Sequence, residues 1–147
     1  MTDSIKRLIK YGRKYIDYRM GMYGAIVMAT IVFSINYYGT QNTFGATTAA
    51  LKQGTYTFLF GGVIMRMSER LATEVSKRIL ALVLACVVPS MVSLTLTFGV
   101  HSLKGTLKPL ASTIPTAIFV IPSTLIWGLM SRKRLEKTTA VDEIFDN

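Results

Sequence analysis

Long apolar stretches alternate along the chain with short polar blocks, and the blocks hold nearly all the charged residues. Three of the stretches contain no charge at all: residues 20–38, 79–100 and 110–130. An α-helix of about 20 mostly apolar residues is long enough to cross the hydrocarbon core of a bilayer. The pattern therefore predicts one transmembrane helix over each of these stretches.

A fourth apolar stretch, residues 54–65, is too short to cross a bilayer alone. It reaches the required length if the helix begins near Thr47, because the long side chain of Lys52 can extend toward the membrane surface. We therefore predict a further span at about residues 47–67. This span is second in chain order and completes a four-helix transmembrane domain over residues 20–131.

The first 19 residues have the pattern of an amphipathic helix that lies on a membrane surface. Apolar residues and one glycine recur at intervals of three and four, while lysine and arginine fill the other side. Anionic headgroups attract such a helix by about 1 kcal/mol per basic residue. The residues of the apolar side are Ile5, Leu8, Ile9, Gly12 and Ile16.

The expected fold class is therefore all-α. We expect a polytopic membrane protein with four antiparallel transmembrane helices, preceded by a basic interfacial helix at residues 1–19. A polar cytoplasmic tail at residues 132–147 follows the last span.

Charge fixes the expected orientation. The chain has 147 residues, a mean hydropathy of +0.40 and a net charge of +9. Fourteen of its 17 lysines and arginines, and all eight acids, fall before the first span, between the second and third, or after the fourth. The positive-inside rule then places both termini in the cytoplasm, in a plasma or inner membrane. Because the cations flank apolar runs, we interpret them as topology signals and expect no nucleic acid partner.

The opposite side of the membrane carries cations and no acid. The segment "HSLKGTLKP" between the third and fourth spans contains His101, Lys104 and Lys108, and Lys52 lies in the other outer region. A helix that begins near Pro109 would add the partial positive charge of its N-terminus. These four side chains are candidates for binding an anion or a lipid headgroup. The alternative is that the segment is only a turn between two helices.

A second charged group follows the second span. Arg66, Glu69 and Arg70 are spaced three and four residues apart, so a helix places them on one face. Glu74 and Arg78 repeat this spacing. One interpretation is a cytoplasmic pocket for a phosphate or carboxylate. The other is a solvated helix end with weak ion pairs, each worth a few tenths of a kcal/mol.

Small residues predict where helices pack closely. Ala50, Gly54 and Gly61 share one face of the second span, and Ala81 and Ala85 lie one turn apart on the third. Small side chains let helix backbones approach each other in membranes. Such faces pack within the bundle or between subunits.

Prolines interrupt the third and fourth spans at Pro89, Pro115 and Pro122. Each lacks an N–H and leaves a carbonyl one turn back without its helical donor. Serine and threonine residues lie nearby on the same helices, and their hydroxyls can satisfy freed backbone groups. A polar path for a substrate is the alternative, since transporters use broken helices at their binding sites.

The sequence lacks the residues that proton-coupled transport, metal binding or nucleophilic catalysis would require. The four spans contain no aspartate or glutamate, which argues against a proton-coupled transporter. One histidine and one cysteine, Cys86, make no metal-binding pattern. His101 lies on the side opposite to every aspartate, so no Ser–His–Asp triad can form. We therefore expect no catalytic residues, no metal and no cofactor.

These observations favour a small integral membrane protein that serves as a subunit or scaffold of a membrane complex. Its expected partners are anionic membrane lipids, and either copies of itself or the other proteins of a larger complex. The first alternative is binding, transport or flipping of an anionic lipid or lipid-linked substrate at the outer basic group. The second is a membrane-embedded transferase that acts at Arg66, Glu69 and Arg70.

Overall fold

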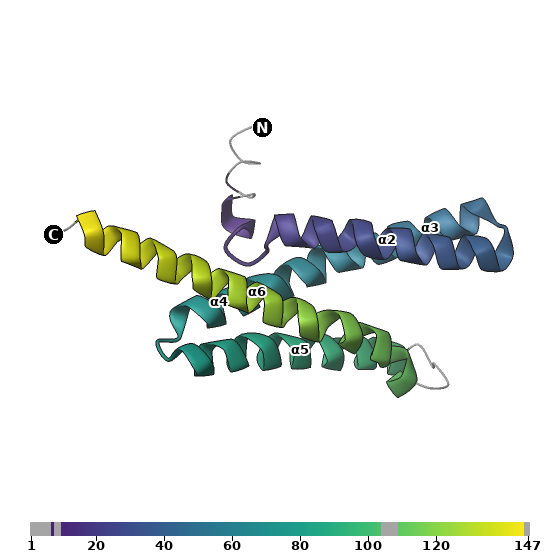
Figure 1. The fold of residues 1–147 in the computed structure, drawn as a ribbon. Coiled ribbons are helices and arrows are strands. Elements are labelled where there is room, and N and C mark those ends of the chain that lie inside the picture. Colours follow the sequence, from purple (N-terminus) through teal and green to yellow (C-terminus); the bar gives the residue numbers. More distant parts are fainter. Residues whose placement is uncertain (1–6, 8–9, 104–108, 146–147) are drawn as a thin grey trace. The chain divides into compact units, whose positions relative to one another are not determined.

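The computed structural model describes residues 7, 10–103 and 109–145, and every regular element in this part of the chain is helical (Figure 1). Three of the helices are long and apolar enough to cross a membrane. These spans overlap the three uncharged stretches and indicate an integral membrane protein. The elements are α2 (Tyr18–Thr40), α3 (Thr43–Tyr56), the π-helical turn η1 (Thr57–Gly61), α4 (Gly62–Glu74), α5 (Arg78–Leu103) and α6 (Pro109–Phe145).

The span expected at residues 47–67 is helical but is not one of these three. The backbone is helical at every residue from Thr43 to Glu74, through α3, η1 and α4. The sequence of α3, "TFGATTAALKQGTY", has many polar residues, so its mean hydropathy is much lower than that of α5. A fourth crossing therefore remains a prediction.

The chain divides into two compact units, residues 1–66 and 67–147, and each is described by itself. In the first unit, α2 and α3 pack along each other and are joined by only two residues (Figure 1). Gln41 has a φ of 54° and ends α2 in the left-handed conformation, with its N–H bonded to the Tyr37 carbonyl. Asn42 then begins α3, because its side chain accepts a hydrogen bond from the N–H of Gly45. This short connection makes the two helices an antiparallel hairpin.

The region before α2 contains a turn. Residues 10–12 are helical, residues 13–15 form a turn, and Asp17 then caps α2 by accepting hydrogen bonds from the N–H groups of Arg19 and Met20. The helical residues described here thus end at Gly12, well before the expected boundary at residue 19. Most of residues 1–9 lie outside the described part, so the basic interfacial helix stays a prediction.

Small residues form the contact between α2 and α3, as the sequence predicted for Ala50 and Gly54. Ala46 and Ala50 are buried, and a Cβ on Gly54 would lie 3.3 Å from the Cβ of Ala29 on α2. The helix backbones can come this close because these side chains are so small.

At the next position of this face, the close contact within the first unit is made by Gly62 and not by Gly61, so a packing role for Gly61 between subunits stays a prediction. A Cβ on Gly62 would come within 2.6 Å of Ile16 Cγ2 and 3.0 Å of the Asp17 carbonyl oxygen. The nearest atom to a Cβ on Gly61 is 3.6 Å away, which is an ordinary distance. A π-helical turn takes up one residue more than an α-helical turn, and η1 thereby moves the packing face by one position.

In the second unit, α5 packs along α6 (Figure 1). Ala81 and Ala85 are completely buried, which confirms the small-residue contact expected on α5. Gly128 of α6 faces Ala85, and a Cβ there would lie 3.1 Å from the alanine Cβ. Pro89 lies inside α5, and Pro115 and Pro122 lie inside α6. α6 begins at Pro109, as expected, and remains helical through the polar segment after residue 131.

Candidate functional site

A cluster of hydroxyl groups lies in the interior of the second unit around Thr124 of α6. Thr124 is completely buried, and its hydroxyl lies 3.0 Å from the carbonyl oxygen of Val120 and 3.1 Å from that of Ile121. The hydroxyl of Ser90, on α5, lies 3.0 Å from the Thr124 hydroxyl. This pair directly connects α5 and α6 next to the buried Pro89.

Two further contacts extend this cluster. Ser68, on α4, is completely buried and donates a hydrogen bond to the Thr124 carbonyl at 3.0 Å. Cys86, on α5, lies with its sulfur 3.8 Å from the Ile121 carbonyl, and its own carbonyl is 3.4 Å from the Thr124 hydroxyl. Pro89 and Pro122 leave the carbonyls of Ala85 and Ile118 without their helical donors, and these are not the carbonyls that the hydroxyls of the cluster contact. The buried hydroxyls nevertheless bind backbone carbonyls and one another, which favours a structural role for them over a polar path.

Ser123, on α6, also forms a hydrogen bond to the backbone. Its hydroxyl donates to the carbonyl of Phe119, one turn earlier in the same helix, at 2.6 Å. A hydroxyl that donates to a carbonyl of its own helix is a common arrangement for serine in membrane helices.

Arg132 is a charged residue of the second unit that is mostly removed from solvent and makes several hydrogen bonds. Only 13% of its side chain is exposed. Its Nη1 donates to the carbonyls of Ala72 at 3.2 Å and Val75 at 2.7 Å, and its Nη2 donates to the carbonyl of Ser76 at 2.9 Å. The last carbonyls of a helix have no partner within it, and a cation is favourable there. Arg132, on α6, thus caps the end of α4.

Glu136 completes this arrangement. It lies one turn after Arg132 and accepts a hydrogen bond from its Nε at 3.2 Å. It also forms an ion pair with Nε of Arg78, at the start of α5, at 3.6 Å. Arg78 is much more exposed than Arg132, with 58% of its side chain accessible. The carboxylate therefore lies between a mostly buried cation and an exposed one, and its contact with the exposed Arg78 is the weaker of the two.

Sequence reasoning missed the role of Arg132. The expected charged cluster of Arg66, Glu69 and Arg70 lies on α4, where all three side chains are partly exposed. The expected pairing of Glu74 with Arg78 assumed a continuous helix, but α4 ends at Glu74 and α5 begins at Arg78. The four-residue spacing of Arg132 and Glu136 was a usable signal for their pair. Nothing in the sequence showed that the arginine also reaches the end of α4.

The structure describes only part of the outer basic group, which is the set of four residues Lys52, His101, Lys104 and Lys108. Lys52 is exposed on α3, in the first unit. His101 belongs to the last turn of α5, but its side chain is outside the described part of the structure. Lys104 and Lys108 lie in the segment 104–108, which is also outside it. The convergence of these four residues therefore remains a prediction.

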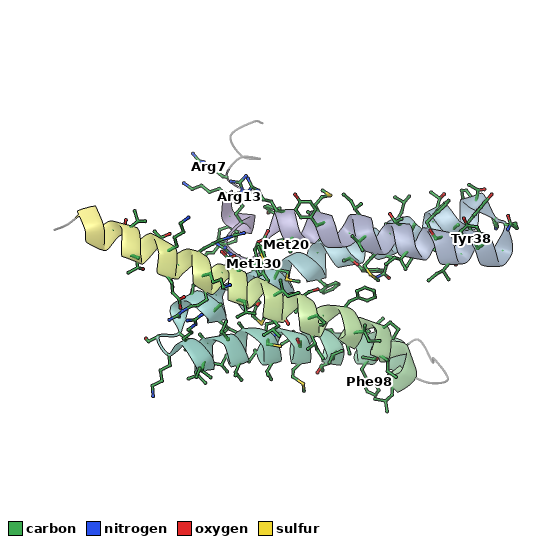
Figure 2. The ribbon with its side chains drawn as sticks, in the orientation of Figure 1. Arg7, Arg13, Met20, Tyr38, Phe98 and Met130 are labelled. Atoms are coloured by element: carbon green, nitrogen blue, oxygen red, sulfur yellow. The ribbon has the colours of Figure 1, made fainter. Side chains whose placement is uncertain are left out.

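Two shallow grooves can be described on the surface of the second unit, among the residues that the structure describes. The loop-end groove has a volume of about 340 Å³ and lies between the end of α5 and the beginning of α6. Phe98, labelled in Figure 2, is one of its residues. The α5-start groove has a volume of about 500 Å³ and is lined by Lys77, Arg78, Ile79, Leu80 and Val83. The residues of the loop-end groove are Leu94, Thr95, Phe98, Leu110, Thr113, Ile114 and Ala117.

Outside the spans, two tyrosines interact before α2. The rings of Tyr11 and Tyr15 are 5.5 Å apart, and a hydrogen bond with Tyr15 raises the pKa of Tyr11 above its usual value of 10.0. Lys14 lies 5.6 Å from the centre of the Tyr15 ring. The phenol of Tyr11 therefore stays neutral at physiological pH.

The described residues contain no group of three or more histidine, cysteine, aspartate or glutamate side chains placed to hold a metal ion. Comparisons with known proteins add no family: no family model matches the sequence, no curated protein matches it, and no solved structure matches its fold.

Proposed function

We propose that the protein is a non-catalytic subunit or scaffold of a membrane complex. The observation that carries this proposal is that several polar groups inside the second unit form hydrogen bonds between its helices. The hydroxyls of Ser68, Ser90 and Thr124 and the guanidinium of Arg132 bind backbone carbonyls and one another. Groups bonded in this way hold helices together, and a polar core of this kind suits a rigid membrane component.

The surfaces of the three spans support the same role. Only 11%, 22% and 17% of their apolar windows are buried within the protein. The remaining apolar faces contact lipid or the helices of another protein chain. A partner with matching faces could therefore bind without any rearrangement of the buried hydroxyl cluster.

The test is purification from the native host in a mild detergent, followed by native mass spectrometry. The proposal expects a defined assembly, either with a second protein in fixed stoichiometry or with copies of this chain. Transfer to lipid nanodiscs with a large excess of lipid controls for detergent-induced association. A protein that is monomeric in both environments, with no partner after cross-linking in cells, would contradict the proposal.

A second candidate function is the binding or transport of an anionic lipid or lipid-linked substrate on the outer side. The loop-end groove favours it, because its lining helices α5 and α6 are joined by the segment that contains Lys104 and Lys108. An apolar groove between two helices that a basic segment connects suits a lipid with an acidic headgroup.

Replacement of both lysines tests this candidate. Lys104→Ala combined with Lys108→Ala is expected to abolish lipid transfer in proteoliposomes while expression and assembly are unchanged. Lys133→Ala combined with Lys137→Ala removes the same charge from exposed positions of α6 and serves as the control. Unchanged transfer in the first variant would rule out this function.

A further inference from the structure

The α5-start groove is a shallow, open and mostly apolar surface, and two cationic residues are among those that line it. Lys77 and Arg78 lie at one end, where α5 begins, and Ile79, Leu80 and Val83 supply the remaining lining. The candidate transmembrane span of α5 also begins at Arg78. The cations of the groove thus lie where the polar surface of a membrane meets its hydrocarbon core.

Both cations can bind a further anion. Lys77 is exposed, and Arg78 forms its ion pair with Glu136 through Nε at 3.6 Å, with both side chains well exposed to solvent. Exposed ion pairs are weak, so this contact does not hold the guanidinium firmly. An arginine has five N–H donors in a planar fork that matches the oxygens of a phosphate. The first turn of α5 contains no acid to compete for the two cations.

The apolar wall continues along α5 away from the cations. Ile79 is 80% exposed, and Val83 and Val87 are each 50% exposed. These residues are four apart, so they form one stripe along the helix surface. The stripe follows the direction in which an acyl chain would enter the bilayer.

We propose that the α5-start groove binds one anionic phospholipid. The phosphate contacts Lys77 and Arg78, and an acyl chain lies over Ile79, Leu80 and Val83. A polar anionic head joined to an apolar chain matches a groove with two cations at one end and an aliphatic wall. This site is separate from the loop-end groove, and it does not depend on the role of the protein as a subunit.

Lipid retention in nanodiscs tests the site with the full chain. The nanodiscs contain phosphatidylglycerol and phosphatidylcholine, and native mass spectrometry measures which lipid stays bound after release. The wild-type protein is expected to keep one phosphatidylglycerol. Lys77→Gln with Arg78→Gln is expected to weaken this retention by at least about tenfold, because each cation near the surface contributes roughly fivefold. The exchange Lys77→Arg with Arg78→Lys keeps the charge and should keep the lipid.

The matched control distinguishes a site from general attraction. Lys133→Gln with Lys137→Gln removes the same charge from exposed positions of α6, and retention should stay within about twofold of the wild type. An equal loss in both double variants would overturn the proposal. Binding of glycerol phosphate as tight as that of phosphatidylglycerol would also overturn it, because the acyl chain would then contribute nothing to recognition.

A photoreactive residue tests the occupant without removal of any charge. Leu80→p-benzoylphenylalanine is expected to cross-link to phosphatidylglycerol in preference to phosphatidylcholine. The same residue at Leu125, an exposed position of α6, should show no preference. Cross-linking from position 80 to a second copy of the chain, or to both lipids equally, would contradict the proposed occupant.

Discussion

Arg132 shows how a single side chain can hold the end of one helix from another. Its guanidinium is mostly removed from solvent, and three backbone carbonyls and the Glu136 carboxylate surround it. A buried cation is stable only where such partners satisfy it. The charge of arginine and its several N–H donors both contribute to these contacts, so we expect this position to tolerate few replacements.

The Arg132 variants provide the first prediction. Arg132→Ala removes the cap of α4 and leaves Glu136 without its nearest cation, so the free energy of unfolding should fall by about 3 kcal/mol. Arg132→Lys keeps the charge but cannot reach several carbonyls at once, and about half of that loss is expected. Equilibrium unfolding of the purified protein measures both values. Lys133→Ala, at the exposed neighbouring position, should change stability by less than about 0.5 kcal/mol. An equal effect at both positions would contradict the role assigned to Arg132.

Thr124 provides the second prediction at this scale. Thr124→Val keeps the volume but removes the hydroxyl that Ser90 contacts, and a loss of about 1 kcal/mol in the free energy of unfolding is expected. Thr124→Ser keeps the hydroxyl and should therefore retain most of the wild-type stability. Thr139→Val is the control, because the Thr139 hydroxyl is exposed and bonds only to the Leu135 carbonyl of its own helix among the described contacts. If Thr139→Val is as destabilising as Thr124→Val, the cluster has no special role.

Among the elements, η1 has the clearest effect on packing. Its additional residue moves the packing face of the helix by one position, which brings Gly62 against the backbone at Asp17. The same residue's carbonyl accepts a hydrogen bond from the Asp17 N–H at 2.9 Å. The start of α2 is thus attached to the beginning of α4 through a position where only glycine fits.

The adjacent glycines make a matched pair for the third prediction. Gly62→Ala would place a methyl group 2.6 Å from Ile16 Cγ2, and we expect a loss of at least about 1 kcal/mol in the free energy of unfolding from this overpacking. Gly61→Ala adds the same methyl group without a close contact, and the better helix propensity of alanine should make it neutral or stabilising by up to about 1 kcal/mol. Thermal unfolding of the two variants compares them directly. The opposite order would show that η1 does not set the packing face.

The comparison of sequence with structure is most informative for these elements. Uncharged runs located α2, α5 and the start of α6 because the cost of burying charge in a bilayer acts on every residue of a span. The identity of the close-packed glycine depended on a π-helical turn, which leaves no regular periodicity in the sequence. The carbonyls that bind Arg132 lie about 60 residues away in the chain. Local patterns cannot specify such long-range contacts, so the core of the site was not predictable.

For the whole molecule, the number of crossings decides the topology. Four crossings place both termini on the same side of the membrane, whereas three crossings would place them on opposite sides. The positive-inside rule favours four crossings. With three crossings, either the basic N-terminal segment or both of the basic segments that follow residue 65 and residue 131 would lie outside the cytoplasm.

Labelling of the termini tests this fourth prediction. A single cysteine near each end, in a Cys86→Ser background, is treated with a membrane-impermeant reagent in intact and in permeabilised cells. Both termini should react only after permeabilisation. Reaction of one terminus in intact cells would show that residues 47–67 do not cross.

The cap on α4 also has a consequence for the order of events during synthesis. The Ala72 carbonyl leaves the ribosome 60 residues before the arginine that will bind it. At about 5 to 20 residues per second, that interval lasts roughly 3 to 12 seconds. Throughout this time the nascent chain must insert α5 and most of α6 while the end of α4 has only water or other temporary partners. A chain truncated before Arg132 would insert its apolar helices but could not form the contact between Arg132 and the end of α4. We expect membrane quality control to degrade such a chain.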